Sequence, residues 1–221
     1  LRLDKGQIVN GEVQIPADLR KRENLDQVTR HCLGSELKKG ILIHAGFFLG
    51  PNSFYDALKS MTEAERRQIH MTSVLNVNQL YGNQYGNEEL KKLQRRYGRF
   101  FNACLIVTLT GAVCSDGLED GQMVSGVGGQ YNFVSQAHAL EGARSVLMAK
   151  STREKGRADR ANIVWSYGHI TIPRHLRDIV ITEYGIADLR GRCDRDVIQA
   201  LFNITDSRFQ EELLRTAKSA K

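Results

Sequence analysis

The chain has 221 residues, of which 41% are hydrophobic and 25% charged, a composition typical of a soluble globular protein and unlike a low-complexity or collagen-like chain. It carries 31 Lys and Arg against 25 Asp and Glu, and the resulting net charge of +6 slightly favours anionic partners. The longest apolar run covers only 104–109, far short of the ~20 residues that a membrane helix needs. We therefore expect no membrane association.

Patterns of apolar residues, caps and turn residues predict the elements of the N-terminal half. In chain order these are turns and short strands over 6–16, a helix over 18–39, a strand over 41–43, a helix from 51, a helix with a capping box from Thr62, a strand over 71–77 and a helix over 88–97. The last helix carries Glu before Lys and Arg at i,i+4 spacing, which is typical of an exposed helix stabilised by its own ion pairs.

The C-terminal half alternates strands with helices. The predicted elements are a strong strand over 100–110, Asp-Gly turns at 116–117 and 120–121, strands over 145–148, 162–165 and 178–182, and helices over 195–203 and 207–218. No stretch rich in Pro, Gly or Ser divides them. The alternation predicts an α/β fold with a largely parallel sheet and flanking helices.

Cysteine and histidine spacing bears on location and metal binding. Cys32, Cys104, Cys114 and Cys193 are far apart and form no CxxC pair, so we expect reduced thiols in a cytoplasmic protein. The six histidines show no spacing typical of metal ligands, and we predict no metal site. The first residue is Leu and no secretory signal follows it, so we expect a piece of a longer protein.

A glycine cluster, Ser125-Gly-Val-Gly-Gly-Gln130, is the segment with the clearest chemical potential. Three glycines in four residues let the backbone approach a ligand and leave N–H groups free to face an anion or an oxyanion. The cluster matches no nucleotide-binding motif. A tight turn between a strand and a helix is the structural alternative.

Other polar residues allow two interpretations each. The bases among residues 150–160 suit either a phosphate-contacting loop or a solvated one. Glu183 ends a predicted strand and is either a nucleophile or base, or a structural carboxylate that bonds a neighbour such as Arg190. Asn78 is either an amide positioned at a strand end or a turn residue.

Three motifs together resemble a known family. Ser125-Gly-Val-Gly-Gly-Gln-Tyr-Asn-Phe133, Thr182-Glu-Tyr-Gly-Ile-Ala-Asp-Leu-Arg-Gly191 and Ser207-Arg-Phe209 are similar to the C-terminal half of acetyl-CoA hydrolase/transferase proteins, which belong with the family I CoA-transferases. The resemblance implies that 41–221 is that α/β C-terminal domain and that 1–40 is a poorly matching segment before it.

The resemblance implies covalent catalysis of acyl transfer. A glutamate attacks an acyl-CoA thioester, forms an acyl anhydride and then a glutamyl-CoA thioester, and a carboxylate or water completes turnover. Glu12, Glu23 and Glu36 lack the family's flanking residues, so the nucleophile and an N-terminal partner domain are expected upstream of this chain. CoA or acetyl-CoA is then a substrate and not a tightly bound cofactor, and a homodimer is compatible with this.

The resemblance also implies roles for particular residues. Gly129 resembles the glycine that stabilises the oxyanion and contacts CoA, and Asn78 the amide that orients the glutamate. The expected CoA contacts are Ser125, Gly128, Leu105 beside the pantetheine channel, Arg153 and Lys155. The alternatives are a non-catalytic anion- or RNA-binding module, which interleaved acids and scarce aromatics disfavour, and a degenerate homologue.

Overall fold

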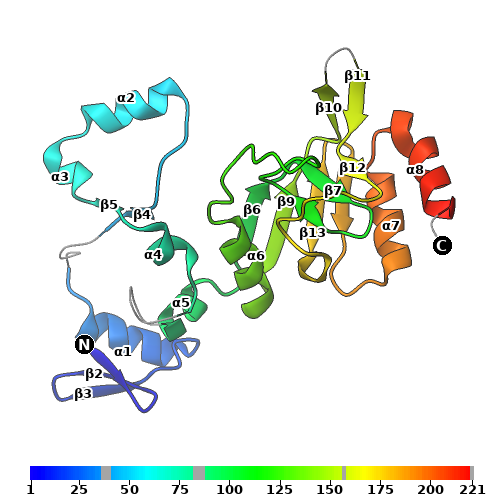
Figure 1. Ribbon diagram of the computed structural model, residues 1–221. Helices are drawn as coiled ribbons and strands as arrows, with labels where there is room; N and C mark the ends of the chain where they lie inside the picture. The colour runs from blue at the N-terminus through cyan, green and yellow to red at the C-terminus, as the bar shows by residue number, and fades with distance from the viewer. Residues whose placement is uncertain (36–40, 82–87, 156–157, 220–221) are drawn as a thin grey trace. The chain divides into compact units, whose positions relative to one another are not determined.

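The computed structural model describes residues 1–35, 41–81, 88–155 and 158–219. By internal contacts the chain separates into two compact units, Leu1–Met71 and Thr72–Lys221 (Figure 1). No described helix is long and apolar enough to cross a membrane. The sequence-based division at residue 40 stays a proposal about where the family's domain begins.

The first unit combines an antiparallel β-meander, helices and one parallel strand pair. Its elements are β1 (Arg2–Asp4), β2 (Gln7–Asn10), β3 (Val13–Pro16), α1 (Arg22–Cys32), β4 (Ile43–Ala45), α2 (Asn52–Ser60), α3 (Glu63–Arg66) and β5 (Ile69–Met71). β2 pairs with both β1 and β3, whereas β4 runs parallel to β5. The predicted capping box is confirmed: Thr62 and Glu65 each accept a hydrogen bond from the other's backbone N–H.

The second unit is an α/β domain. Its elements are α4 (Val74–Asn78), α5 (Glu88–Gln94), β6 (Arg99–Ala103), β7 (Ile106–Thr108), β8 (Val113–Cys114), α6 (Gln130–Ala139), β9 (Arg144–Met148), β10 (Thr152–Lys155), β11 (Ala158–Ala161), β12 (Ile163–Val164), the 3₁₀ helix η1 (Arg174–Leu176), β13 (Ile179–Thr182), β14 (Gly185–Asp188), α7 (Asp194–Asn203) and α8 (Ser207–Ser219).

Parallel pairing dominates the larger sheet of this domain. Its strand order is β14-β13-β9-β6, in which β6, β9 and β13 are mutually parallel and β14 is an antiparallel edge. A second sheet, β12-β7-β8, pairs β12 parallel to β7, and β10 and β11 form a hairpin. α6 packs on β6 and β9 and α7 on β14, which encloses an apolar core that includes Val134, Leu147, Val180 and Leu201. The predicted α/β fold is therefore confirmed.

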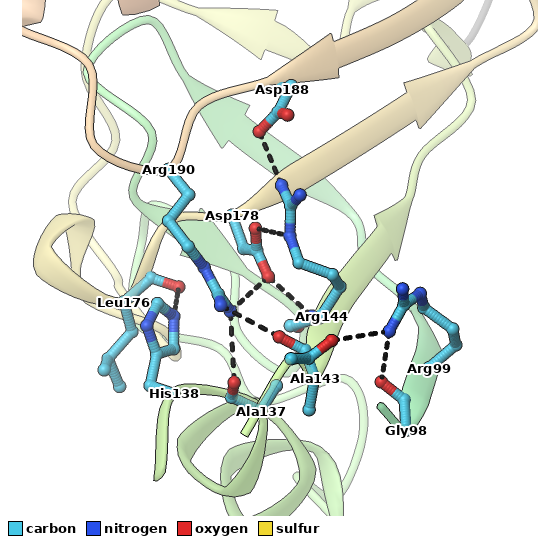
Figure 2. Close-up of polar contacts among 12 residues, drawn as sticks. Gly98, Arg99, Ala137, His138, Ala143, Arg144, Leu176, Asp178, Asp188 and Arg190 are labelled. Carbon is cyan, nitrogen blue, oxygen red and sulfur yellow. Dashed lines mark hydrogen bonds and ion pairs between the residues drawn. The ribbon is translucent and has the colours of Figure 1, made fainter. Parts of the chain in front are cut away.

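A buried carboxylate braces the N-terminal end of the parallel strands (Figure 2). Asp178, whose side chain is fully buried, accepts from Arg144 Nε at 2.7 Å and from the Ser145 N–H at 2.6 Å, and also pairs with Arg190. Arg144 extends to Asp188 on β14 at 2.6 Å. The network ties the three strands together at the edge of the sheet where β9 and β13 begin and the antiparallel β14 ends.

Some sequence-based boundaries are wrong. The strand predicted over 71–77 is the end of β5 followed by the helix α4, and the strand predicted over 100–110 is two strands, β6 and β7, in different sheets. α6 follows the glycine cluster without having been predicted. The basic loop at 150–160 contains the hairpin β10–β11.

Candidate functional site

The glycine cluster lies at the C-terminal edge of the larger sheet, where α/β folds place their sites. β6 and β9 end side by side, because Ala103 pairs with Met148. α6 begins at Gln130, the last residue of the cluster, and the side chain of this residue donates Nε2 to the Ala103 carbonyl at 2.8 Å. This bond fixes the beginning of α6 against the end of β6.

Gly129 and Asn78 meet at the beginning of α6. A Cβ built on Gly129 would lie 1.8 Å from Asn78 Nδ2 and 2.6 Å from its Cγ, so the carboxamide occupies the space beside the glycine Cα. Asn78 is only 7% exposed. The two residues that the resemblance assigns to one site are thus in direct contact, although 50 residues separate them in the sequence.

Two half-buried cationic side chains, Arg95 and Lys91, hold the segment that carries Asn78. Arg95 donates Nη2 to the Val77 carbonyl at 2.8 Å and Nη1 to Gln136 Oε1 on α6 at 2.6 Å. Lys91 donates to the Gln79 carbonyl at 3.2 Å, and Leu80 is buried beside Leu140 of α6. Arg95 therefore links α4, through the Val77 carbonyl, to Gln136 of α6.

The N-terminus of α6 can stabilise developing negative charge. Gly129 is the N-cap with φ −92° and no side-chain cap, and its carbonyl accepts from the Phe133 N–H at 3.1 Å. The first N–H groups of a helix have no partner within it and point along its axis. Gly126 and Gly128 border open space and Gly128 has φ +58°, which leaves the backbone before α6 accessible to a ligand.

Asp116 holds the start of the glycine loop. Its carbonyl accepts from the N–H groups of Val124 at 2.8 Å and Ser125 at 3.2 Å. Its buried carboxylate accepts from the Thr171 hydroxyl and from His169 Nε2, the latter at 3.1 Å. The hydrogen bond from Thr171 is the main cause that holds the pKa of Asp116 below its ordinary value.

The potential ligand atoms of Cys114, Asp116 and His169 lie within 4.8 Å of one another. Cys114 Sγ already donates to the Gly117 carbonyl at 2.9 Å, and His169 is bonded to Asp116. A Cβ on Gly117 would lie 2.5 Å from His169 Cδ2, so the imidazole packs tightly on this turn. Hydrogen bonding and packing account for the arrangement, and we assign no metal to it.

A cavity of about 910 Å³ opens beside the loop and contains two of the residues assigned to CoA. Leu105, 40% exposed, and Arg153 both line it, and so does Val124 at the start of the glycine loop. Arg153 donates Nη1 to the Ala161 carbonyl at 2.9 Å and to the carboxamide of Asn162, which fixes its guanidinium at the wall. Arg153 is thereby held in the hairpin β10–β11.

The other residues assigned to CoA are Ser125, Gly128 and Lys155. Ser125 and Gly128 are exposed in the loop. The backbone of Lys155 belongs to β10, but its side chain lies outside the described part of the chain, as does Glu36. Lys150, which the sequence placed in a stretch suited to either a phosphate-contacting or a solvated loop, lines the cavity; so does Tyr167, which sequence reasoning did not assign, and burial raises the pKa of Tyr167. No motif signals their position, because it depends on how the hairpin folds back.

Glu183 and the basic residues of α5 have structural partners. The Glu183 carboxylate accepts from the Ser151 N–H at 2.9 Å and from its hydroxyl, rather than from Arg190, which pairs with Asp178. On α5, Lys92 pairs with Glu88 at 2.6 Å, as expected for a surface helix. Because the bases of α5 are engaged in ion pairs and carbonyl contacts, the case for an RNA-binding surface there is weak.

The fold and this site define an α/β domain that presents a glycine loop and a helix N-terminus at the C-terminal edge of a parallel sheet. Comparison with known families then identifies it. Residues 50–217 match the acetyl-CoA hydrolase/transferase C-terminal domain, and the chain belongs to that family. The expected resemblance is confirmed.

Curated relatives agree with this family. The chain is 34% identical to 4-hydroxybutyrate coenzyme A transferase of Clostridium kluyveri over 62% of its own length and 32% of the relative's. It is 30% identical to succinyl-CoA:cyclohexane-1-carboxylate CoA transferase of Geobacter metallireducens, over 79% of this chain and 37% of that protein. The chain thus spans about a third of the length of these relatives.

Among solved structures, RipA from Yersinia pestis matches with a TM-score of 0.63 and 26% identity, over 88% of this chain and 41% of that one. A 4-hydroxybutyrate CoA-transferase from Porphyromonas gingivalis matches with a TM-score of 0.57 and 23% identity, over 79% of this chain and 36% of that one, and supports the fold.

Proposed function

We propose that this chain is the C-terminal half of an enzyme that transfers CoA from an acyl-CoA thioester to a carboxylate, or hydrolyses the thioester, through a glutamyl-CoA intermediate. The contact between Gly129 and Asn78 at the start of α6 carries the proposal. The nucleophilic glutamate is supplied by sequence outside this chain, in an N-terminal partner domain of the same cytoplasmic protein.

In this mechanism the chain supplies electrostatic stabilisation and positioning. Each acyl exchange passes through a tetrahedral intermediate whose oxyanion faces the N–H groups around Gly129. Removing one such donor typically costs ~10²–10³ in rate. The Asn78 carboxamide is close enough to the same backbone to hold a carboxylate there, and its burial keeps it in one orientation.

The cavity beside the loop suits the extended part of CoA. Leu105, Val124 and Met148 give it an apolar wall for the pantetheine arm, and Lys150 and Arg153 give it positive charge for the phosphates. Ser125, Gly128 and Lys155 complete the proposed contacts. CoA is a substrate in this scheme and leaves after each turnover.

The test uses the full-length protein with acetyl-CoA, in the presence and absence of candidate carboxylates. Chromatography follows free thiol and new thioesters. A new thioester that requires an acceptor identifies a transferase, and free thiol without an acceptor identifies a hydrolase. The absence of both products across several acyl donors contradicts the proposal.

The chain itself allows a binding test of the same site. We expect CoA to raise its melting temperature at constant salt, and Arg153→Gln to weaken that effect. Arg215→Gln, on the exposed face of α8, removes the same charge and is the control. RNA binding with a steep salt dependence, without stabilisation by CoA, would favour the rival function.

A further inference from the structure

A cationic hollow lies at the other end of α6 from Gly129. It has a volume of about 360 Å³ and a single carboxylate, Asp194, among its described lining residues. His138 in the last turn of α6 borders it, so about 15 Å of helix separates it from the glycine loop. The cationic and imidazole side chains that line it are Arg174, Arg177, Arg190, Arg192, His138 and His175.

Two of these arginines are a fixed frame. Arg177 donates to the Thr110 carbonyl at 2.9 Å and to Asp194 Oδ1 at 2.8 Å, and it packs over Gly111, where a Cβ would lie 2.8 Å from its Cδ. Arg190 donates to the Ala143 carbonyl at 2.8 Å and pairs with Asp178 (Figure 2). Their guanidinium groups therefore keep their places whether or not a ligand is present.

Of the other side chains that line the hollow, His138 is already bonded through Nε2 to the Leu176 carbonyl at 3.0 Å (Figure 2). Arg174 uses Nη1 for Asp194 Oδ2 at 2.7 Å, so both oxygens of that carboxylate are taken. The side chains of His175 and Arg192 have no polar partner among the residues that the structure describes. Arg190 Nε is buried and also has no acceptor. Arg174, His175 and Arg192 are exposed, so the hollow is open to solvent, and its concentration of positive charge is complementary to an anion.

We propose that this hollow binds a phosphate group, either inorganic phosphate or that of a small phosphorylated metabolite. Guanidinium groups match phosphate oxygens in bidentate geometry. The free donors come from two segments, η1 and the turn before α7, and so approach from different directions. That arrangement suits the tetrahedral oxygens of phosphate better than the two coplanar oxygens of a carboxylate. This site is separate from the proposed CoA cavity, which shares no lining residue with it.

The test is titration of the chain with phosphate at fixed ionic strength, followed by calorimetry and by the melting temperature, with chloride and acetate as reference anions. We expect phosphate alone to bind and stabilise, and Arg174→Gln with Arg192→Gln to weaken that binding at least tenfold. Arg2→Gln with Arg22→Gln removes the same charge from the first unit and should bind phosphate normally. Equal binding by both double variants, or equal binding of acetate, would overturn the proposal.

Nuclear magnetic resonance of the unmodified chain tests the location without any variant. Phosphate should shift the backbone amide signals of His175, Gly191 and Arg192 in a saturable way, and shifts confined to other residues contradict the proposal. Glycerol phosphate in place of inorganic phosphate distinguishes the two sources: tighter binding of the ester identifies a metabolite. Arg153→Gln should leave phosphate binding intact, so failure of the CoA site and failure of this site are separable.

Discussion

Gly129→Ala is the substitution for which the structure makes the sharpest prediction. The backbone tolerates alanine, because φ at this position is −92°. The new Cβ would lie 1.8 Å from Asn78 Nδ2, about 2 Å closer than an ordinary nonbonded contact allows. Asn78 is buried, so its carboxamide must leave its place or α4 must move away from α6.

The expected size of the effect differs for stability and activity. Overpacking of this kind costs about 1–3 kcal/mol of unfolding free energy, measurable by urea denaturation of the chain. In the full-length protein a displacement of 1 Å or more at the proposed oxyanion site should lower kcat by about 10²-fold, measured by the thioester assay. Gly126→Ala is the matched control for the stability measurement, because its Cβ would meet nothing within 4 Å.

A double-mutant cycle tests whether the loss of unfolding free energy in Gly129→Ala is caused by the clash with Asn78. Asn78→Ala removes the carboxamide and makes room for the Cβ, so adding Gly129→Ala to it should change the unfolding free energy far less than Gly129→Ala does alone. Strictly additive effects, or full activity of the single Gly129→Ala variant, would refute the reasoning.

Three further substitutions test the framework of the domain. Asp178→Asn leaves two guanidinium groups without their buried partner and should lower the unfolding free energy, measured by urea denaturation, by about 3–5 kcal/mol. Asp188→Asn, at the half-exposed end of the network, should lower it much less. Equal losses for the two variants would contradict the role of Asp178 as a buried brace. Thr171→Val removes the main cause of the lowered pKa of Asp116. A carboxylate with a lowered pKa stabilises the fold above about pH 4, and this stabilisation is lost as the carboxylate is protonated at lower pH. The melting temperature of the variant should therefore lie furthest below that of the unmodified chain at about pH 6, and the difference should shrink below about pH 4. Arg95→Gln should cost about 1.5–3 kcal/mol and speed hydrogen exchange over residues 76–80, and unchanged exchange would show that α4 is held by other contacts.

Much of the second unit could be predicted because its strands carry local signals. β9 and β13 are short apolar runs at the centre of the sheet, and α7 and α8 are amphipathic. The strand predicted over 71–77 is wrong because an apolar run of this length fits a strand or a helix equally well. A helical turn begins at Ser73, whose carbonyl accepts from the Asn76 N–H at 2.9 Å. The strand over 100–110 divides at Cys104 and Leu105, where the chain leaves one sheet for the other.

The candidate site could not be assembled from the sequence by physical reasoning alone. The glycine cluster indicated an anion-binding loop, but nothing in the spacing of Asn78 and Gly129 predicts their contact, which depends on Arg95 fastening α4 to α6. The resemblance to the family paired the two residues before their geometry was known. The cavity beside Leu105 depends on the hairpin β10–β11, which was not predicted because the charged sequence of 150–160 lacks the apolar alternation typical of strands.

The contact between Gly129 and Asn78 also restricts how the protein can evolve. Any side chain at 129 collides with the carboxamide at 78, and shortening residue 78 first to make room removes the amide itself. Under the proposed mechanism either single change lowers activity, so we expect the two positions to vary together. Lineages that abandon the chemistry are free to change both, and a replacement at either position should therefore accompany a replacement at the other.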